Sequence, residues 1–189
     1  MKSIFYGKKG TEKPIEIFVA LFVILAVALV MLKLFQNQIT EQKNKLGKIE
    51  QERKQQDLKE TAVLYCKDKC TEASNDGCSL KSLASLCIAY GSNAIKSPDY
   101  LDFNNNGMKD LDTSQLAGIG VCEDAVPCFI LTSDCCGRQL NGRECKLILT
   151  DYWTSQGIDV ATMMTANIKK GVCTATNGTT MWYTLAGFP

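Results

Sequence analysis

The sequence PIEIFVALFVILAVALVMLKLF, residues 14–35, decides the fold of this chain of 189 residues. From Ile17 to Leu32 it is apolar without interruption and contains neither glycine nor proline. About 22 helical residues span about 33 Å, which is enough to cross the hydrocarbon core of a bilayer. A helix in a soluble core would carry a polar face at helical spacing, and this run has none. The sequence therefore predicts a membrane-spanning helix over residues 14–35.

The flanks of this run indicate that it is kept in the mature protein. The chain begins MKSIFYGKKG, and the polar sequence QNQITEQKNK follows the run. A secretory signal peptide would instead have a shorter apolar core and small residues at a cleavage site. These flanks also contain a short motif: Lys8, Lys9 and Gly10 precede the run, and Glu16 lies at the start of the apolar helix.

This motif resembles the class III signal of type IV pilins, particularly those of archaea, and the resemblance covers about the first third of the chain. It implies that a prepilin peptidase cuts after Gly10 on the cytoplasmic side, so that residues 1–10 are a leader. The apolar helix would then anchor the subunit in the membrane and later form the core of a filament. Glu16 would meet the free amino terminus of a neighbouring subunit. It becomes the sixth mature residue, whereas the glutamate of the family is usually the fifth.

An ordinary single-pass anchor is the alternative interpretation of the same residues. In that case Lys8 and Lys9 are the positively charged cytoplasmic flank of the span. Glu16 then lies at the N-terminus of the helix, where the helix dipole favours a carboxylate.

Composition excludes several functions. The net charge is +1, and no cluster of Lys and Arg with interleaved aromatic residues occurs, so we expect no nucleic-acid partner. Histidine is absent from the chain, which removes Ser-His-Asp and Cys-His catalysis and every histidine metal site. We therefore expect that the protein is not an enzyme. An ectoenzyme that uses a carboxylate pair such as Asp110 and Asp112 is the least supported alternative.

Ten cysteines follow the apolar run and none precedes it. An even number on one side of a membrane predicts a disulfide framework in an oxidising exterior. Structural zinc is the competing interpretation, but only one pair has the spacing of a zinc knuckle. The spacing leaves the pairing open. The cysteines are Cys66, Cys70, Cys78, Cys87, Cys122, Cys128, Cys135, Cys136, Cys145 and Cys173.

Residues 36–65 are rich in Gln, Glu and Lys and contain no proline, which favours a helix over a disordered linker. Glu41 with Lys45 and Glu50 with Lys54 are oppositely charged pairs at i,i+4 spacing. Sparse apolar residues lie near one side of the predicted helix and would meet a partner. We expect a solvated stalk that continues the membrane helix, with a bend at Gly47.

Residues 102–110 resemble the first half of an EF-hand-like calcium loop, and more closely the DxDxDGxxD loops of extracellular proteins. The twelfth position is Thr113, where an EF-hand has a glutamate. A turn stabilised by Asn and Asp side chains, with no ion, is the alternative. The ligands would be the side chains of Asp102, Asn104, Asn106 and Asp110 and the backbone carbonyl of Met108.

The remaining segments predict one short helix and several strands. Apolar residues at helical spacing indicate an amphipathic helix over residues 78–90. Short apolar runs predict strands over 128–132, 145–150 and 160–165, and Asn177-Gly178 predicts a hairpin turn. Asn177 also begins a glycosylation sequon. Trp153 and Trp182 are expected in the core or on a sheet face.

Together these features predict an α+β protein. Its parts are a leader (1–10), a membrane or filament-core helix (14–35), a helical stalk (36–65) and a small disulfide-rich head (66–189) with a mainly antiparallel sheet. Lysines before the span and cysteines after it place the N-terminus in the cytoplasm and the head outside. We expect a major or minor pilin of an adhesive surface filament that associates with itself, the membrane and pilus assembly machinery. A single-pass surface protein with a binding ectodomain is the alternative.

Overall fold

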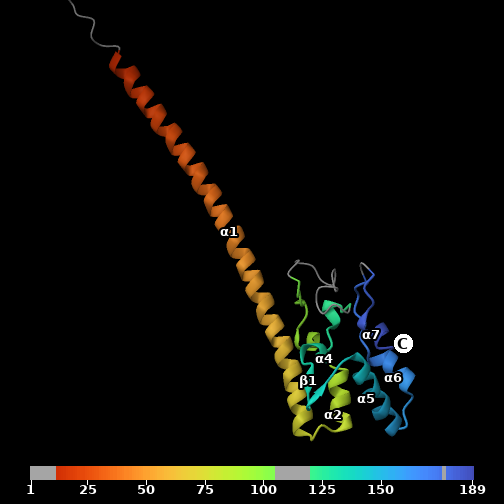
Figure 1. Cartoon of the computed structure of the whole chain (residues 1–189). Helices are drawn as coiled ribbons and strands as arrows, with labels where there is room; N and C mark the ends of the chain where they lie inside the picture. The colour runs from red at the N-terminus through yellow and green to blue at the C-terminus, as the bar shows by residue number, and fades with distance from the viewer. Residues whose placement is uncertain (1–11, 105–119, 176–177) are drawn as a thin grey trace, which may run out of the picture. The chain divides into compact units, whose positions relative to one another are not determined.

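The computed structural model describes residues 12–104, 120–175 and 178–189 (Figure 1). The chain separates into two units, Met1–Glu50 and Gln51–Pro189, which we call the helical unit and the head unit. Helix α1 (Glu12–Asn75) supplies the described part of the helical unit and then the first helix of the head unit. Residues 51–65, which we predicted as part of the stalk, therefore belong to the head unit.

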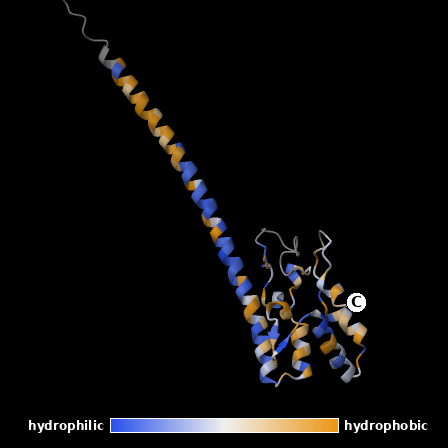
Figure 2. Cartoon of the chain, viewed as in Figure 1, coloured by the Kyte–Doolittle hydropathy of each residue, from blue (hydrophilic) through white to orange (hydrophobic). Residues whose placement is uncertain are grey.

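In the helical unit, α1 confirms the predicted helix over the apolar run and the stalk. The helix passes through Gly47, the expected bend, without interruption. Every described side chain from residue 15 to residue 50 is exposed. Figure 2 shows that the hydrophobic residues form a continuous first stretch of α1, followed by a mainly hydrophilic stretch. The described part of this unit is thus a single helix with no core of its own.

In the head unit, one side of α1 is buried and the chain then reverses. The buried residues Gln55, Ala62, Cys66 and Ala73 are spaced by whole turns and define this side. The helix ends at Asn75. Beyond it, Gly77 has a positive φ of 65°, and the Cys78 N–H donates to the Ala73 carbonyl at 2.8 Å. This is a Schellman ending, which satisfies the last carbonyls of α1.

The rest of the head unit is mainly helical. Helix α2 (Leu80–Cys87) confirms the predicted amphipathic helix and is capped by Ser79, which accepts the Ser82 N–H. It packs on α5 (Gly142–Ser155), which packs on α6 (Val160–Asn167). The short elements are η1 (Gly91–Ala94), η2 (Glu123–Ala125), α4 (Cys128–Leu131) and α7 (Trp182–Leu185).

The head unit contains an antiparallel sheet, as expected, but a much smaller one, and the three strands predicted over 128–132, 145–150 and 160–165 are wrong. Residues 128–132 form the turn α4, residues 145–150 lie inside α5, and residues 160–165 lie inside α6. Helix-capping residues explain the difference, because Asn141 accepts the N–H groups of Arg143 and Glu144, and Asp159 accepts that of Thr162. Hydrogen bonds from the Thr162 side chain and from its backbone N–H also lower the pKa of Asp159. A capped segment with its apolar residues at i, i+3 and i+4 favours a helix over a strand.

The sheet that does form is a small hairpin of β1 (Asp134–Cys135) and β2 (Arg138–Gln139). Its two-residue loop, Cys136-Gly137, has positive φ at both positions, 58° and 66°. This is the type I′ geometry that matches the twist of antiparallel strands. The hairpin predicted at Asn177-Gly178 has no strands on either side in the described chain, where α7 follows instead. Asn177 itself lies outside the described residues.

Five disulfides join all ten cysteines, as predicted, and their order is simple. The first five cysteines pair in sequence with the last five, so the bonds close loops of 51 to 65 residues. Loops of this length restrict the unfolded chain strongly. The pairs are Cys66–Cys128, Cys70–Cys135, Cys78–Cys136, Cys87–Cys145 and Cys122–Cys173.

Candidate functional site

The first candidate is the apolar surface of α1 in the helical unit. Its large hydrophobic side chains from Ile15 to Phe35 are each between 52% and 75% exposed. They face every direction around the helix, because the run has no polar stripe. A monomeric soluble protein rarely exposes a continuous apolar surface of this size. Among the described residues, this is the one helix long and apolar enough to cross a membrane.

The residues predicted for N-terminal processing fall on both sides of the described boundary. Glu16 lies near the start of α1 and is exposed. Lys8, Lys9 and Gly10 lie outside the described residues. The structure therefore presents Glu16 at the N-terminal end of the apolar surface, where a carboxylate interacts favourably with the helix dipole.

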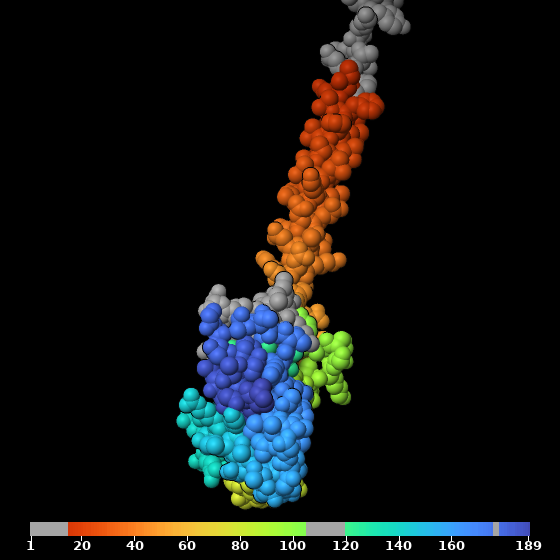
Figure 3. Space-filling model, turned by 90° about the vertical axis from the view of Figure 1, so that its right-hand side faces the viewer, coloured from red at the N-terminus to blue at the C-terminus, as the bar shows by residue number. Residues whose placement is uncertain are grey.

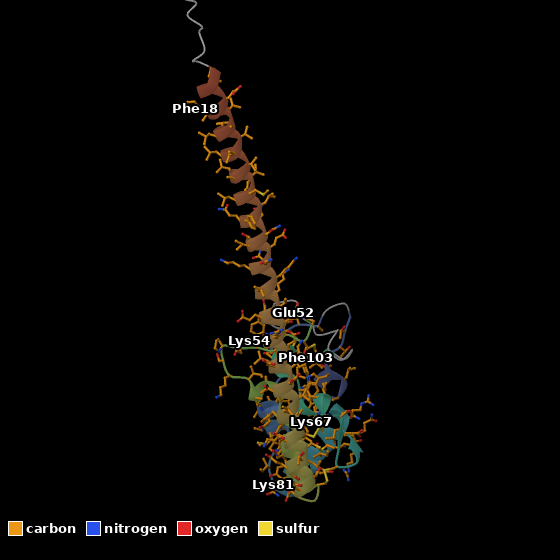
Figure 4. The ribbon with its side chains drawn as sticks, turned by 90° about the vertical axis from the view of Figure 1, so that its left-hand side faces the viewer. Phe18, Glu52, Lys54, Lys67, Lys81 and Phe103 are labelled. Atoms are coloured by element: carbon orange, nitrogen blue, oxygen red, sulfur yellow. A yellow bond between two sulfur atoms is a disulfide. The ribbon has the colours of Figure 1, made fainter. Side chains whose placement is uncertain are left out.

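Residues 99–104, which we call the strap, are hydrogen-bonded to the first turns of α1 in the head unit. Figure 4 labels Lys54 of α1 and Phe103 of the strap. Lys54 forms an ion pair with Asp99 at 2.5 Å, in place of the predicted pair with Glu50. The Gln55 side chain donates to the Tyr100 carbonyl at 3.2 Å and accepts the Asp102 N–H at 3.0 Å. These contacts join chain segments more than 40 residues apart, and so they align the strap with α1.

Phe103 secures the end of the same strap. The Lys59 ammonium donates to the Phe103 carbonyl at 3.3 Å and lies 5.6 Å from the centre of the Phe103 ring. Glu123, which is fully buried, accepts the N–H groups of Phe103 at 2.9 Å and of Asn104 at 3.3 Å. Sequence reasoning missed Glu123, because a single acid in a three-residue helix carries no recognisable pattern.

The predicted calcium loop begins at this strap. Asp102 is buried at 2% exposure and Asn104 is partly buried. Asn106, Met108 and Asp110 lie outside the described residues. Within residues 12–104, 120–175 and 178–189, no group of three or more acidic or cysteine side chains has metal-binding geometry. Calcium therefore stays a prediction from the sequence.

An aromatic cluster around Trp182 forms the C-terminal part of the core. The Trp182 ring makes edge-to-face contacts with Phe129, Phe188 and Tyr183 at centroid distances of 5.2, 5.5 and 5.9 Å. Trp182 and Trp153 are 2% and 3% exposed, which confirms their predicted place in the core. Figure 3 shows that the C-terminal residues, in dark blue, lie on one face of the head unit.

Tyr90 joins two distant segments inside the head unit. Its side chain is fully buried, and its hydroxyl oxygen accepts the Lys169 N–H at 2.7 Å. Burial raises the pKa of Tyr90 to about 12, although this hydrogen bond acts in the opposite direction. On the surface, the hydrogen bond from Lys69 to Glu72 raises the pKa of Lys69. Burial of Tyr90 thus makes the folded state favour the protonated phenol.

No family model, curated protein or solved structure matches this chain. The functional interpretation therefore depends on the residues themselves. They provide an exposed apolar helix at one end and a compact unit held by disulfides at the other. Such a chain can enter an apolar environment through its helix while the head unit folds in an oxidising aqueous one.

Proposed function

We propose that this protein is a structural subunit of a type IV pilus-like surface filament used for attachment. Residues 14–35 hold the precursor in the membrane and then pack with the same residues of other subunits in the filament core. The N-terminus is cytoplasmic, and the head unit lies outside the cell. A peptidase removes residues 1–10 before assembly.

The observation that carries this proposal is the exposed apolar surface of α1, uninterrupted from Ile17 to Leu32. Such a surface needs lipid or other apolar helices around it, because its exposure to water is strongly unfavourable. Glu16 at its start supports a subunit over a simple anchor, because a carboxylate there can pair with the new amino terminus of a neighbour. The five disulfides support an extracellular head unit.

The leader provides the decisive experiment. Intact-mass and N-terminal analysis of protein from native membranes should find a mature chain that begins at Thr11. Gly10→Val should block the cut and leave the leader in place. Gly7→Ala, which changes the other glycine of the leader, is the matched control and should be processed normally.

The second candidate is a single-pass surface protein with a binding ectodomain, which the same apolar helix also supports. It predicts an intact N-terminus, Met1 included or removed alone, and no filaments by electron microscopy of the native cells. Those two results together would reject the filament subunit. A processed N-terminus with filaments that contain the protein would reject the simple anchor.

A further inference from the structure

The polar part of the helical unit carries a second, narrower apolar surface. Ile39, Leu46 and Ile49 are 51%, 64% and 45% exposed and follow one another at spacings of seven and three. These are the a, a and d positions of a heptad, with Gln42 at the intervening d position. Phe35, four residues before Ile39, continues the same seam towards the membrane. The seam therefore runs along one side of α1 from the apolar run into the polar stretch.

Lipid cannot cover the part of the seam formed by Ile39, Leu46 and Ile49. Lys43, Lys45, Lys48 and Glu50 lie among its apolar residues and are exposed on the other sides of the helix. Charged side chains are too costly to place in the hydrocarbon core, so the segment lies outside it. Its apolar residues can then be covered only by another helix or other protein surface.

The charged residues beside the seam, Lys45 and Glu50, favour a second copy of this chain as the partner. With Leu46 at position a, Lys45 occupies position g and Glu50 occupies position e. In a parallel pair of helices in register, g of one chain meets e of the other chain five residues further on. Lys45 of one copy therefore lies opposite Glu50 of the second copy, and the two-fold symmetry repeats the pair. Opposite charges at these positions specify partner and orientation.

We infer that residues 36–50 pair with the same residues of a second copy of this chain, as a parallel, in-register coiled coil just outside the membrane. The inference rests on the membrane anchoring of the proposed function and not on polymerisation. Two heptads are too short to pair firmly in water. Anchoring gives both copies the same orientation and a high effective concentration, which favours the short contact.

A cysteine on the seam tests this pairing directly. All ten native cysteines are in disulfides, so an added cysteine would be the free thiol. Leu46→Cys places this thiol opposite itself in a symmetric pair, and mild oxidation of native membranes should give mostly covalent dimer. Asn44→Cys is the matched control, because position f faces away from the partner, and should give at least five-fold less dimer. Equal dimer from both variants, or none from Leu46→Cys, would overturn the pairing.

A charge exchange tests the register. In the Leu46→Cys background, Lys45→Glu should lower the yield of dimer several-fold, because like charges then face each other. Adding Glu50→Lys should restore the yield. Failure of this rescue would reject the proposed register.

Extraction of the membranes with alkali separates the two proposals. Protein that resists extraction but does not cross-link at residue 46 would overturn the pairing and leave the proposed function intact. Protein that is washed off the membrane would overturn both.

Discussion

The helical unit and the head unit are stabilised in opposite ways. The helical unit exposes every described side chain from residue 15 to residue 50, and its hydrogen bonds are local to one helix. The head unit buries two tryptophans and closes five covalent loops. The first unit therefore takes its stability from its surroundings, and the second from its own core and crosslinks. Conditions that act on one of these sources should leave the other unit unchanged.

Reduction of the disulfides should have the largest effect, and only on the head unit. Each bond closes a loop of at least 51 residues, worth about 4 kcal/mol in the chain-entropy estimate. We expect reduced protein in detergent to lose the near-ultraviolet circular dichroism of Trp153 and Trp182. Its far-ultraviolet signal from residues 12–50 should persist. Persistence of the tryptophan signal after complete reduction would show that the core alone stabilises the head unit.

A charge in the apolar run should act on the helical unit alone. Leu25→Lys places an ammonium near the centre of the span, which costs about 2.5–3.5 kcal/mol for insertion. The fraction of protein that resists alkaline extraction should fall, while the disulfides still form. Asn44→Lys, outside the apolar run, is the control and should extract like the native chain. Equal extraction of both variants would contradict membrane insertion of residues 14–35.

Alanine substitutions at two glycines of the head unit distinguish the cost of backbone strain from the cost of steric crowding. Both have positive φ, but a Cβ on Gly171 would lie 2.3 Å from the Cβ of Cys122, whereas a Cβ on Gly157 would meet nothing within 4 Å. Gly157→Ala should lower the free energy of unfolding by about 1–2 kcal/mol. Gly171→Ala should cost clearly more, because it also displaces the Cys122–Cys173 bond. Thermal unfolding of both variants checks this, and equal costs would contradict the crowding.

Calcium, if it binds, should stabilise the head unit and not the helical unit. At a concentration of 100 times the dissociation constant, one site adds about 2.7 kcal/mol. Unfolding curves of the head unit with calcium or with a chelator should therefore differ, and Asp110→Ala should remove the difference. Asp112→Ala, two residues on and outside the predicted ligand set, is the control. Identical curves for the native chain would reject the predicted loop.

Alkaline pH should act on the head unit through Tyr90. The pKa of Tyr90 rises from 10.0 to about 12 on folding, so the folded state favours the protonated phenol. The stability that this provides is complete below pH 10 and is lost as the pH rises towards 12. The rise in the pKa from 10.0 to about 12 corresponds to a loss of about 2.7 kcal/mol at most. Denaturant unfolding between these pH values should show the loss of stability. Tyr90→Phe should make the free energy of unfolding less dependent on pH over this range.

The two units also differ in how far the sequence predicts them. An unbroken apolar run and a stretch without proline predict the helix over residues 14–65, and α1 continues beyond it to Asn75. The strands were wrong because short runs such as residues 145–150 fit a strand and a buried helix equally well. The capping residues Asn141 and Asp159 were the available signal. Among the site residues, Asp102 was predicted as a calcium ligand, which stays a prediction, and the burial of Glu123 against the same strap depends on long-range packing.

The order in which the cysteines pair has a consequence for chain cleavage. Because the first five bond in sequence to the last five, a single cut anywhere between Cys66 and Cys173 leaves at least one bond across the break. A protease that cuts the head unit once between Cys66 and Cys173 therefore releases no fragment. The nicked molecule should migrate as one band without reductant and as two with it, because the disulfides hold the two fragments together.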